Sequence, residues 1–152
     1  MTDFRFARDE GNADDVARHL KACDPAFMPP LSERLDISEY AARLANDATC
    51  FEAWSSNELT GLVAAYCNAA DRRKAFITSV SVLSRQQGNG IAAKLLDRCI
   101  EYVQKLGFHR IELEVNGGNK AAIALYERFG FVSIQMTDNL MTMTIDLQKD
   151  AK

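Results

Sequence analysis

The stretch with the clearest chemical meaning is a short loop with two glycines, which reads QGNGIA from Gln87 to Ala92. Before it, residues 75–82 alternate like a strand, and after it residues 91–106 repeat with the period of an amphipathic helix. Glycine allows positive φ and lets a ligand approach the backbone closely. The first turn of a helix offers unpaired N–H groups and the positive end of its dipole. The stretch therefore predicts a site for a phosphate or pyrophosphate.

The loop alone fits more than one phosphate ligand. Residues 88–93 satisfy the dinucleotide pattern G-x-G-x-x-G/A, and Glu112 and Glu114 follow at about the distance of the ribose-binding acid. However, residues 83–87 separate the strand from Gly88, and the chain after Val115 has room for one helix and one hairpin only. A dinucleotide fold needs further β-α repeats. The sequence has no G-K-[ST], which excludes a P-loop for a nucleoside triphosphate.

The metal-ligating residue types are too scattered to predict a metal site. They are Cys23, Cys50, Cys67, Cys99, His19 and His109. No two cysteines form a C-x-x-C pair, and neither histidine has a ligand neighbour at metal-site spacing. We expect small buried thiols in a reducing cytoplasm and no bound metal.

Length and composition indicate one ordinary globular domain. The chain has 152 residues, 47% of them hydrophobic and 26% charged, which is enough for one substantial core. The net charge of −3 argues against nucleic-acid binding. No apolar run reaches membrane-spanning length and the polar start is no signal peptide, so we expect a cytoplasmic protein without membrane contact. We also expect a monomer or a homodimer. The predicted domain covers residues 1–147, and residues 148–152 form a frayed tail.

Sequence periodicity predicts the elements that hold the loop in place. The expected strands are 4–7, 50–55, 59–67, 75–82, 110–115, 131–136 and 140–147. The expected helices are 12–22, 37–45, 91–106 and 119–129. Prolines break the pattern between the first two helices, so residues 25–36 read as an exposed linker. Strands 50–82 should form an antiparallel meander, and the last two strands a closing hairpin.

Two segments in this order resemble the GCN5-related N-acetyltransferase (GNAT) family. Gln87 to Ala92 is similar to its acetyl-coenzyme-A loop, [RQ]-x-x-G-x-[GA]. Asn119 to Phe131, which reads NKAAIALYERFGF, is similar to its segment N-x-x-A-x-x-x-Y-x-x-x-G-F. The resemblance implies an α+β fold of order β-α-α-β-β-β-α-β-α-β-β. Its central sheet is mixed, mostly antiparallel, with about seven strands and about four flanking helices.

The resemblance also implies how acetyl-CoA is bound. The strand before the loop should splay from strand 110–115, so that the pantetheine arm pairs with the backbone near Val80 and Val82. A bulge in strand 75–82 would aim an N–H at the thioester carbonyl. The small residues there allow a bulge but do not prove one. The residues implied to hold the coenzyme are Val80, Val82, Gln87, Gly88, Asn89, Gly90, Ile91, Ala92, Asn119 and Tyr126. For Asn119, a plain helix N-cap is an equal alternative.

Tyr126 and Glu114 are the implied catalytic residues. Tyr126 matches the family tyrosine that protects or protonates the coenzyme sulfur. Glu114 precedes it by the interval of the glutamate–tyrosine pair in the ribosomal-protein alanine acetyltransferase branch. A base is needed because an alkylammonium must lose a proton before it attacks. A chain of water molecules in place of Glu114 remains open.

The acceptor is the least determined feature. The run from Phe27 to Ser32, with Arg34, Asp36 and Tyr40, is similar to a family branch of surface-polysaccharide biosynthesis, which implies an amino sugar or other small amine. Packing is an equal alternative for this run, since Phe27 and Leu31 would then cover the core. The Glu114–Tyr126 interval instead suggests a protein N-terminal or lysine acetyltransferase. A non-catalytic acetyl-CoA-binding module on the same scaffold is the third alternative.

Overall fold

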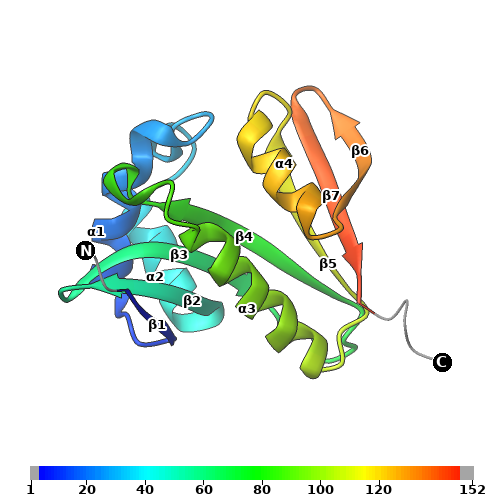
Figure 1. Cartoon of the computed structure of the whole chain (residues 1–152), viewed down its shortest axis with the longest axis horizontal. Coiled ribbons are helices and arrows are strands. Elements are labelled where there is room, and N and C mark those ends of the chain that lie inside the picture. The colour runs from blue at the N-terminus through cyan, green and yellow to red at the C-terminus, as the bar shows by residue number, and fades with distance from the viewer. Residues whose placement is uncertain (1–3, 148–152) are drawn as a thin grey trace.

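The computed structural model describes residues 4–147 (Figure 1). The strands are β1 Arg5–Arg8, β2 Thr49–Ser55, β3 Glu58–Tyr66, β4 Lys74–Val82, β5 Arg110–Asn116, β6 Val132–Thr137 and β7 Leu140–Asp146. The helices are α1 Ala13–Cys23, α2 Ile37–Asp47, α3 Ile91–Lys105 and α4 Lys120–Arg128. This is the element order expected from the sequence, with ends shifted by one or two residues.

All seven strands form one sheet in the order β1-β2-β3-β4-β5-β7-β6. Only β4 and β5 are parallel, and the other neighbours are antiparallel. A parallel pair needs a crossover, which α3 supplies as it crosses the sheet between β4 and β5. The predicted mixed, mostly antiparallel sheet is therefore confirmed.

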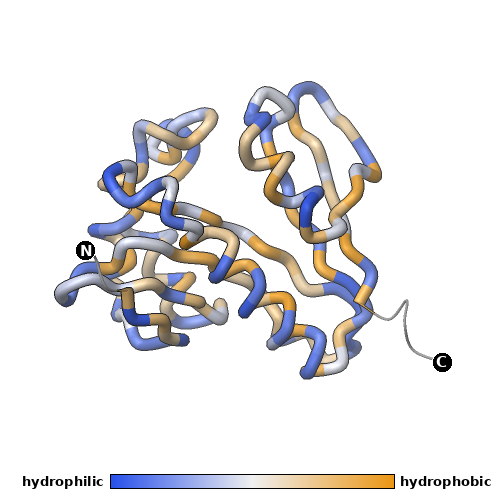
Figure 2. The backbone as a smooth tube through the Cα atoms, viewed as in Figure 1, coloured by the Kyte–Doolittle hydropathy of each residue, from blue (hydrophilic) through white to orange (hydrophobic). Residues whose placement is uncertain are grey.

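The sheet separates two hydrophobic clusters. Helices α1 and α2 pack on one face with Leu62 and Ala64, whereas α3 and Tyr126 of α4 pack on the other with Val63 and Ala65. Because β3 is buried on both faces, its sequence is almost continuously apolar (Figure 2). The loop after β4 is hydrophilic in the same view.

The first turn of α3 is fixed against the centre of the sheet. A Cβ on Gly61 of β3 would lie 2.6 Å from Cγ2 of Ile91, so only glycine permits this approach. Ile91 is 3% exposed and begins the helix directly after Gly90. The packing of Ile91 on Gly61 therefore sets the position of the glycine loop.

One sequence-based expectation was wrong. Residues 25–36 are not simply an exposed linker, because they form two 3₁₀ turns, Asp24–Ala26 and Leu31–Glu33. Leu31 is buried and Phe27 packs against the α1–α2 cluster. The prolines did end the helical pattern, but Phe27 and Leu31 of this segment pack in the core, whereas Met28 is exposed. Residues 148–152, the predicted tail, lie outside the described residues.

The four cysteines are buried free thiols, as expected. Burial raises the pKa of Cys23 to about 11 and that of Cys50 to about 12. Such thiols remain protonated near neutral pH and are poor nucleophiles.

His19 joins α1 to the strands with two buried hydrogen bonds. Its Nδ1 lies 3.0 Å from the Leu59 carbonyl oxygen, which can only accept, so Nδ1 carries the proton. Nε2 lies 2.8 Å from Ser81 Oγ and accepts from that hydroxyl in the neutral ring. Burial lowers the pKa of His19 to about 4.

We expect this histidine to make folding pH-dependent. The folded pKa lies below the unfolded value of 6.5, so the unfolded chain takes up the proton first as the pH falls. Acidification from pH 7 to 4 should therefore reduce the free energy of unfolding by about 3 kcal/mol through His19 alone. Urea titrations of wild type and His19→Gln would show this as a difference in slope with pH. His109→Gln, which removes an exposed histidine, should keep the wild-type slope; equal slopes for His19→Gln and wild type would contradict the prediction.

Candidate active site

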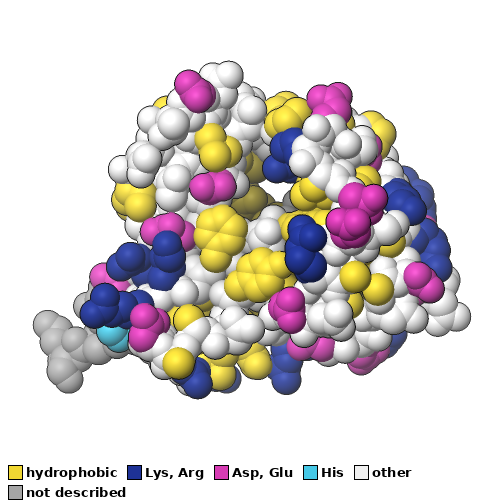
Figure 3. Space-filling model, turned by 180° about the vertical axis from the view of Figure 1, so that it is seen from behind, with side chains coloured by type: hydrophobic (Ala, Val, Ile, Leu, Met, Phe, Trp, Pro, Cys, Tyr) yellow, Lys and Arg dark blue, Asp and Glu magenta, His cyan; other side chains and the backbone are white. Residues whose placement is uncertain are grey.

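The centre of the candidate site is the place where β4 and β5 separate. Their parallel pairing runs from Lys74 opposite Arg110 to Ile77 opposite Leu113, and then stops. β4 continues to Val82 beside β3, while β5 continues to Asn116 beside β7. The two strands diverge in Figure 1, and Figure 3 shows the opening between the α1–α2 part and the β5–β7 part of the molecule as a notch. The splay expected from the sequence is present.

A bulge in β4 lies at the start of the opening. Ala65 pairs with Ile77 and Ala64 pairs with Ser79, so Thr78 is an extra residue with no opposite partner on β3. The bulge also changes which residues of β4 face α3, from the odd-numbered ones before it to the even-numbered ones after it. Ala75 and Ile77 pack in the α3 cluster before it, and Val80 and Val82 pack there after it.

The sequence contained a signal for this bulge. The spacing of apolar residues changes from 75 and 77 to 80 and 82, a shift of one residue in a period of two. An extra residue in a strand produces that shift, because each added residue moves the side chains to the other face.

The hydrogen-bond pattern of β4 shows which backbone groups face the opening. The Leu83 N–H donates to the Thr60 carbonyl at 2.9 Å, which makes Gly61 and Val82 a pair without mutual bonds. Bonded and non-bonded pairs alternate in an antiparallel ladder. The backbone groups of Ser79 and Ser81 therefore point to β3, and those of Val80 and Val82 point to the opening left by β5.

The loop after β4 presents a row of free backbone donors. The N–H groups from Gly88 to Ala93 have no hydrogen-bond acceptor within residues 4–147. They end at the N-terminus of α3, where the helix dipole adds positive potential. Gly88 and Gly90 have φ of 91° and 73°, and a Cβ on either would meet nothing within 4 Å. The loop is thus an open concavity of N–H groups suited to an anion.

Gln87 and Asn89 build the loop with their side chains. The Gln87 N–H donates to the Ser84 carbonyl at 3.3 Å and its Nε2 donates to the Val82 carbonyl at 3.3 Å. Asn89 Nδ2 donates to the Gln86 carbonyl at 3.0 Å. The free donors therefore begin at Gly88, one residue later than the sequence predicted.

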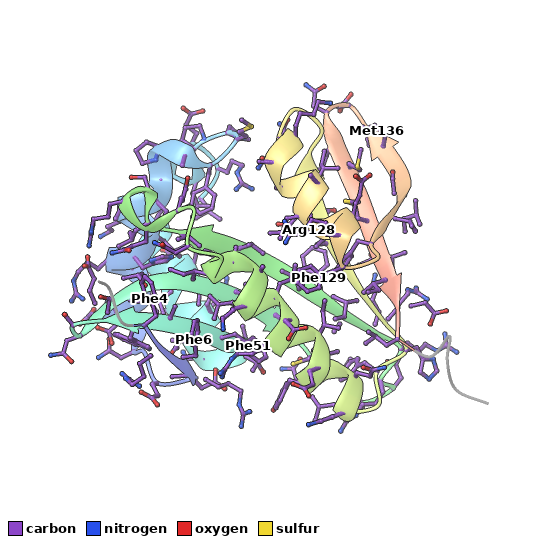
Figure 4. The ribbon with its side chains drawn as sticks, in the orientation of Figure 1. Phe4, Phe6, Phe51, Arg128, Phe129 and Met136 are labelled. Atoms are coloured by element: carbon purple, nitrogen blue, oxygen red, sulfur yellow. The ribbon has the colours of Figure 1, made fainter. Side chains whose placement is uncertain are left out.

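A hollow of about 200 Å³ lies between the loop and α4. Its walls include Val82, Gly88 and Gly90 on one side and Leu125 and Arg128 on the other. Arg128 is exposed and lies at the end of α4 (Figure 4), without an ion-pair partner in the described part of the chain. Sequence reasoning missed Arg128, since it lies 38 to 40 residues beyond the loop glycines and no local pattern connects them.

The two basic residues that flank the loop in sequence are engaged elsewhere. Arg85 forms an ion pair with Glu58. Lys94 Nζ lies 5.7 Å from the centroid of the Phe6 ring. Arg128 is thus the basic side chain that the fold brings to this hollow.

Tyr126 packs on the same face of the sheet as α3. Its ring is 6% exposed and meets Phe131 edge to face, with the centroids 5.9 Å apart. Its hydroxyl has no hydrogen-bond partner in the described chain. Since no fully buried side-chain oxygen in that part of the chain lacks a partner, the hydroxyl oxygen of Tyr126 is accessible at the surface. Burial raises the pKa of Tyr126 to about 12, and the group stays protonated at neutral pH.

Glu114 lies on the opposite face of the sheet. It follows Leu113, the last residue that pairs with β4, and its neighbours Leu113 and Val115 point into the α3 cluster. Glu114 is exposed and has no ion pair among residues 4–147. Glu112, two residues earlier on the same face, is held by Lys74 at 3.2 Å and Arg110 at 3.8 Å. Of the two carboxylates, Glu114 is the one at the opening and without an ion pair in the described part of the chain.

Asn119 caps α4. Its Oδ1 accepts a hydrogen bond from the Ala122 N–H at 3.2 Å, so Asn119 is the helix N-cap that was predicted as one alternative. This bond does not use the Nδ2 group of Asn119.

The α1–α2 face of the molecule, which lies at the back in Figure 1, has a groove. Figure 3 shows this face, with hydrophobic side chains at the base of the groove between the two parts of the molecule. Within residues 4–147, no three or more His, Cys, Asp or Glu side chains are grouped as they would be around a metal ion. No helix in that range is long and apolar enough to cross a membrane.

Comparison with known proteins supports one family. Residues 13–131 match the model described as the Acetyltransferase (GNAT) family. N-alpha-acetyltransferase MAK3 of Arabidopsis thaliana is 34% identical over 86 residues, which cover 55% of this chain and 44% of that protein. L-2,4-diaminobutyric acid acetyltransferase of Shouchella clausii is 28% identical over 82 residues, which cover 54% of this chain and 46% of that protein. The matches thus span less than half the length of both curated relatives.

Solved structures share the fold over nearly the whole chain. The structure of yncA from Salmonella typhimurium, solved with acetyl-CoA, has a TM-score of 0.71 at 21% identity. The comparison covers 99% of this chain and 96% of that one. Since the family model matches residues 13–131, well over half of the sequence, the protein belongs to the acetyltransferase (GNAT) family.

Proposed function

We propose that the protein is an acetyl-CoA-dependent N-acetyltransferase that moves an acetyl group to a primary amine by direct attack in a ternary complex. The observation that carries this proposal is the continuous line of free backbone groups from Val80 and Val82 to the loop at Gly88–Ala93. Coenzyme A has a polar pantetheine arm joined to a pyrophosphate, and this line offers a strand edge joined to an anion site.

The two faces of the opening separate the reactants. Acetyl-CoA lies on the α3–α4 side, where the loop, Arg128 and Tyr126 are. The amine enters through the groove on the α1–α2 side, where Glu114 is. The thioester lies at the separation of β4 and β5, with the Val80 N–H as the donor to its carbonyl oxygen.

The reaction proceeds in one bond-forming and one bond-breaking step. The amine loses a proton to Glu114, directly or through water, and its nitrogen attacks the thioester carbon. The C–N bond forms as the carbonyl oxygen gains negative charge, and the C–S bond then breaks. The nitrogen, which became positively charged on attack, releases a second proton to solvent through water, and the amide forms. The coenzyme leaves as a thiolate, and the proton held by Glu114 also returns to solvent.

Tyr126 acts on the leaving sulfur as a hydrogen-bond donor. A pKa of about 12 lies well above that of a thiol, about 8.5, so complete transfer of the tyrosine proton would be uphill. A hydrogen bond stabilises the thiolate without that transfer. The thiolate takes its proton from solvent when the coenzyme leaves.

Two acceptor classes have support. A small amine, such as an amino sugar, agrees with the resemblance of residues 27–32, and the diaminobutyric acid acetyltransferase also bears the name of a small amine. A peptide N-terminus agrees with the Glu114–Tyr126 interval and with the name of the N-alpha-acetyltransferase. All of these offer a primary amine, so the chemistry of the site is the same for each.

Release of free thiol from acetyl-CoA over a panel of amines would test the function. The panel should include nucleotide-linked amino sugars, diamino acids and peptides with different first residues. Thiol release that needs an amine supports the proposal, and the best amine identifies the acceptor class. Tight binding of acetyl-CoA without release for any amine would instead support the non-catalytic module.

We expect Gly90→Asp to abolish tight binding of acetyl-CoA. The variant places a negative charge beside the pyrophosphate and should raise the dissociation constant at least about tenfold, while the left-handed backbone costs about 1 kcal/mol of stability. Titration calorimetry and thermal melts would separate the two effects. Gly90→Asn is the matched control because it has the same shape without the charge. An unchanged dissociation constant for Gly90→Asp would mean that the loop does not hold phosphate.

Arg128→Gln should weaken acetyl-CoA binding about fivefold, because an exposed arginine contributes modestly to a phosphate contact. The loss should be smaller at 0.5 M salt than at low salt, since salt screens the interaction. Arg85→Gln, whose arginine is paired with Glu58, should bind as wild type does. Equal losses for the two variants would remove Arg128 from the site.

Glu114→Gln should lower the rate about 100-fold near pH 7 with an amine found in the panel. The loss should shrink toward pH 9, where more of the amine is already deprotonated. Glu112→Gln, on the same face but paired with Lys74, should retain the wild-type profile. A normal rate for Glu114→Gln between pH 6 and 9 would show that water, not this carboxylate, removes the proton.

A further inference from the structure

Tyr40 of α2 binds the bulge of β4 through both of its hydrogen-bonding functions. The hydroxyl donates to the Thr78 carbonyl oxygen at 3.0 Å. The same oxygen lies 2.7 Å from Thr78 Oγ1 and accepts from that hydroxyl. Tyr40 is 7% exposed, and Arg43 lies over its ring at 5.6 Å. Burial raises the pKa of Tyr40, which keeps the donor proton in place.

The bonded carbonyl is the first one of β4 beyond its pairing with β5. That pairing ends at Ile77, and Thr78 is the extra residue of the bulge. The Ser79 N–H points to β3, and in a trans peptide the carbonyl points the opposite way. The Thr78 carbonyl therefore points to the side from which β5 has departed. The Tyr40 hydroxyl takes the place of the missing strand as its partner.

The next backbone donor on that side is the Val80 N–H. It lies one peptide unit beyond Ser79, so its direction depends on how the bulge is turned. A bulge has no partner residue on β3 to fix it, and here its carbonyl is held by Tyr40 alone among the described residues. His19 binds the same strand at Ser81, the residue after Val80.

We propose that Tyr40 is a positioning residue for acetyl transfer: it fixes the bulge at Thr78 and thereby holds the Val80 N–H on the thioester carbonyl of acetyl-CoA. This role rests on the acetyl-CoA site proposed above. In this role Tyr40 acts through the backbone of β4 and not by contact with the coenzyme or the amine. Its effect is on the polarisation of the carbonyl, and that distinguishes it from a residue that only packs α2 on the sheet.

The test is the infrared carbonyl stretch of acetyl-CoA labelled with ¹³C at the acetyl carbonyl. Bound to wild type, the thioester band should move to lower wavenumber, because a hydrogen bond weakens the C=O bond. Tyr40→Phe removes only the hydroxyl and should lose at least half of that displacement. Its dissociation constant for coenzyme A, which has no thioester, should change less than twofold. Turnover with a panel amine should fall about tenfold, with KM for acetyl-CoA little changed.

Two further variants make the outcome decisive. Tyr102→Phe removes another tyrosine hydroxyl, on α3, and should leave the band and the turnover as in wild type. Thr78→Val keeps the carbonyl bond to Tyr40 and loses only the hydroxyl partner, so it should keep most of the displacement. If Tyr40→Phe does not fold, the double variant Tyr40→Phe/Thr78→Val leaves no unpaired hydroxyl and should lose the displacement as the single variant would. A full wild-type displacement in Tyr40→Phe, or in the double variant where the single one is unfolded, overturns the role of Tyr40. Failure of wild type to bind acetyl-CoA would overturn the proposed function itself.

Discussion

The structure depends on the early end of one parallel strand pair. Backbone N–H and C=O groups inside a protein need partners, and a strand that leaves its neighbour exposes a row of them. β4 and β5 stay together for four residue pairs only, so the second half of β4 keeps β3 on one side and has no strand on the other. That open edge and the free N–H groups of the loop after it are one continuous surface for a polar, anionic ligand.

A sheet that opens in its middle must be held from both faces. On one face, Ile91 packs on Gly61 and fixes the first turn of α3, which in turn fixes the loop. On the other face, α1 and α2 reach β4 with polar side chains, His19 to Ser81 and Tyr40 to Thr78. Hydrogen bonds suit this task because they fix the direction of a backbone group, which apolar packing does not.

In the proposed function, the two sides of the opening separate a charged coenzyme from a cationic amine. Arg128 and the helix dipole give the coenzyme side positive potential. Glu114 gives the acceptor side a carboxylate that is free of ion pairs among residues 4–147, whereas Glu112 is occupied by Lys74. In that proposal the reactants meet only where β4 and β5 separate. The same geometry would serve a small amine or a peptide, since the groove on the α1–α2 side decides which one enters.

The sequence by itself determined the glycine loop, the helix that follows it, the element boundaries to within one or two residues, and the family. These are local properties: positive φ at Gly88 and Gly90, capping at Asn12 and Asn119, and the periods of strand and helix act within a few residues. The tertiary structure alone decided the contact between Tyr40 and Thr78 and the placement of Arg128 across the hollow from the loop. Each joins segments whose proximity depends on the order of strands in the sheet and on the packing of helices over it. No short-range pattern of residue types encodes that proximity.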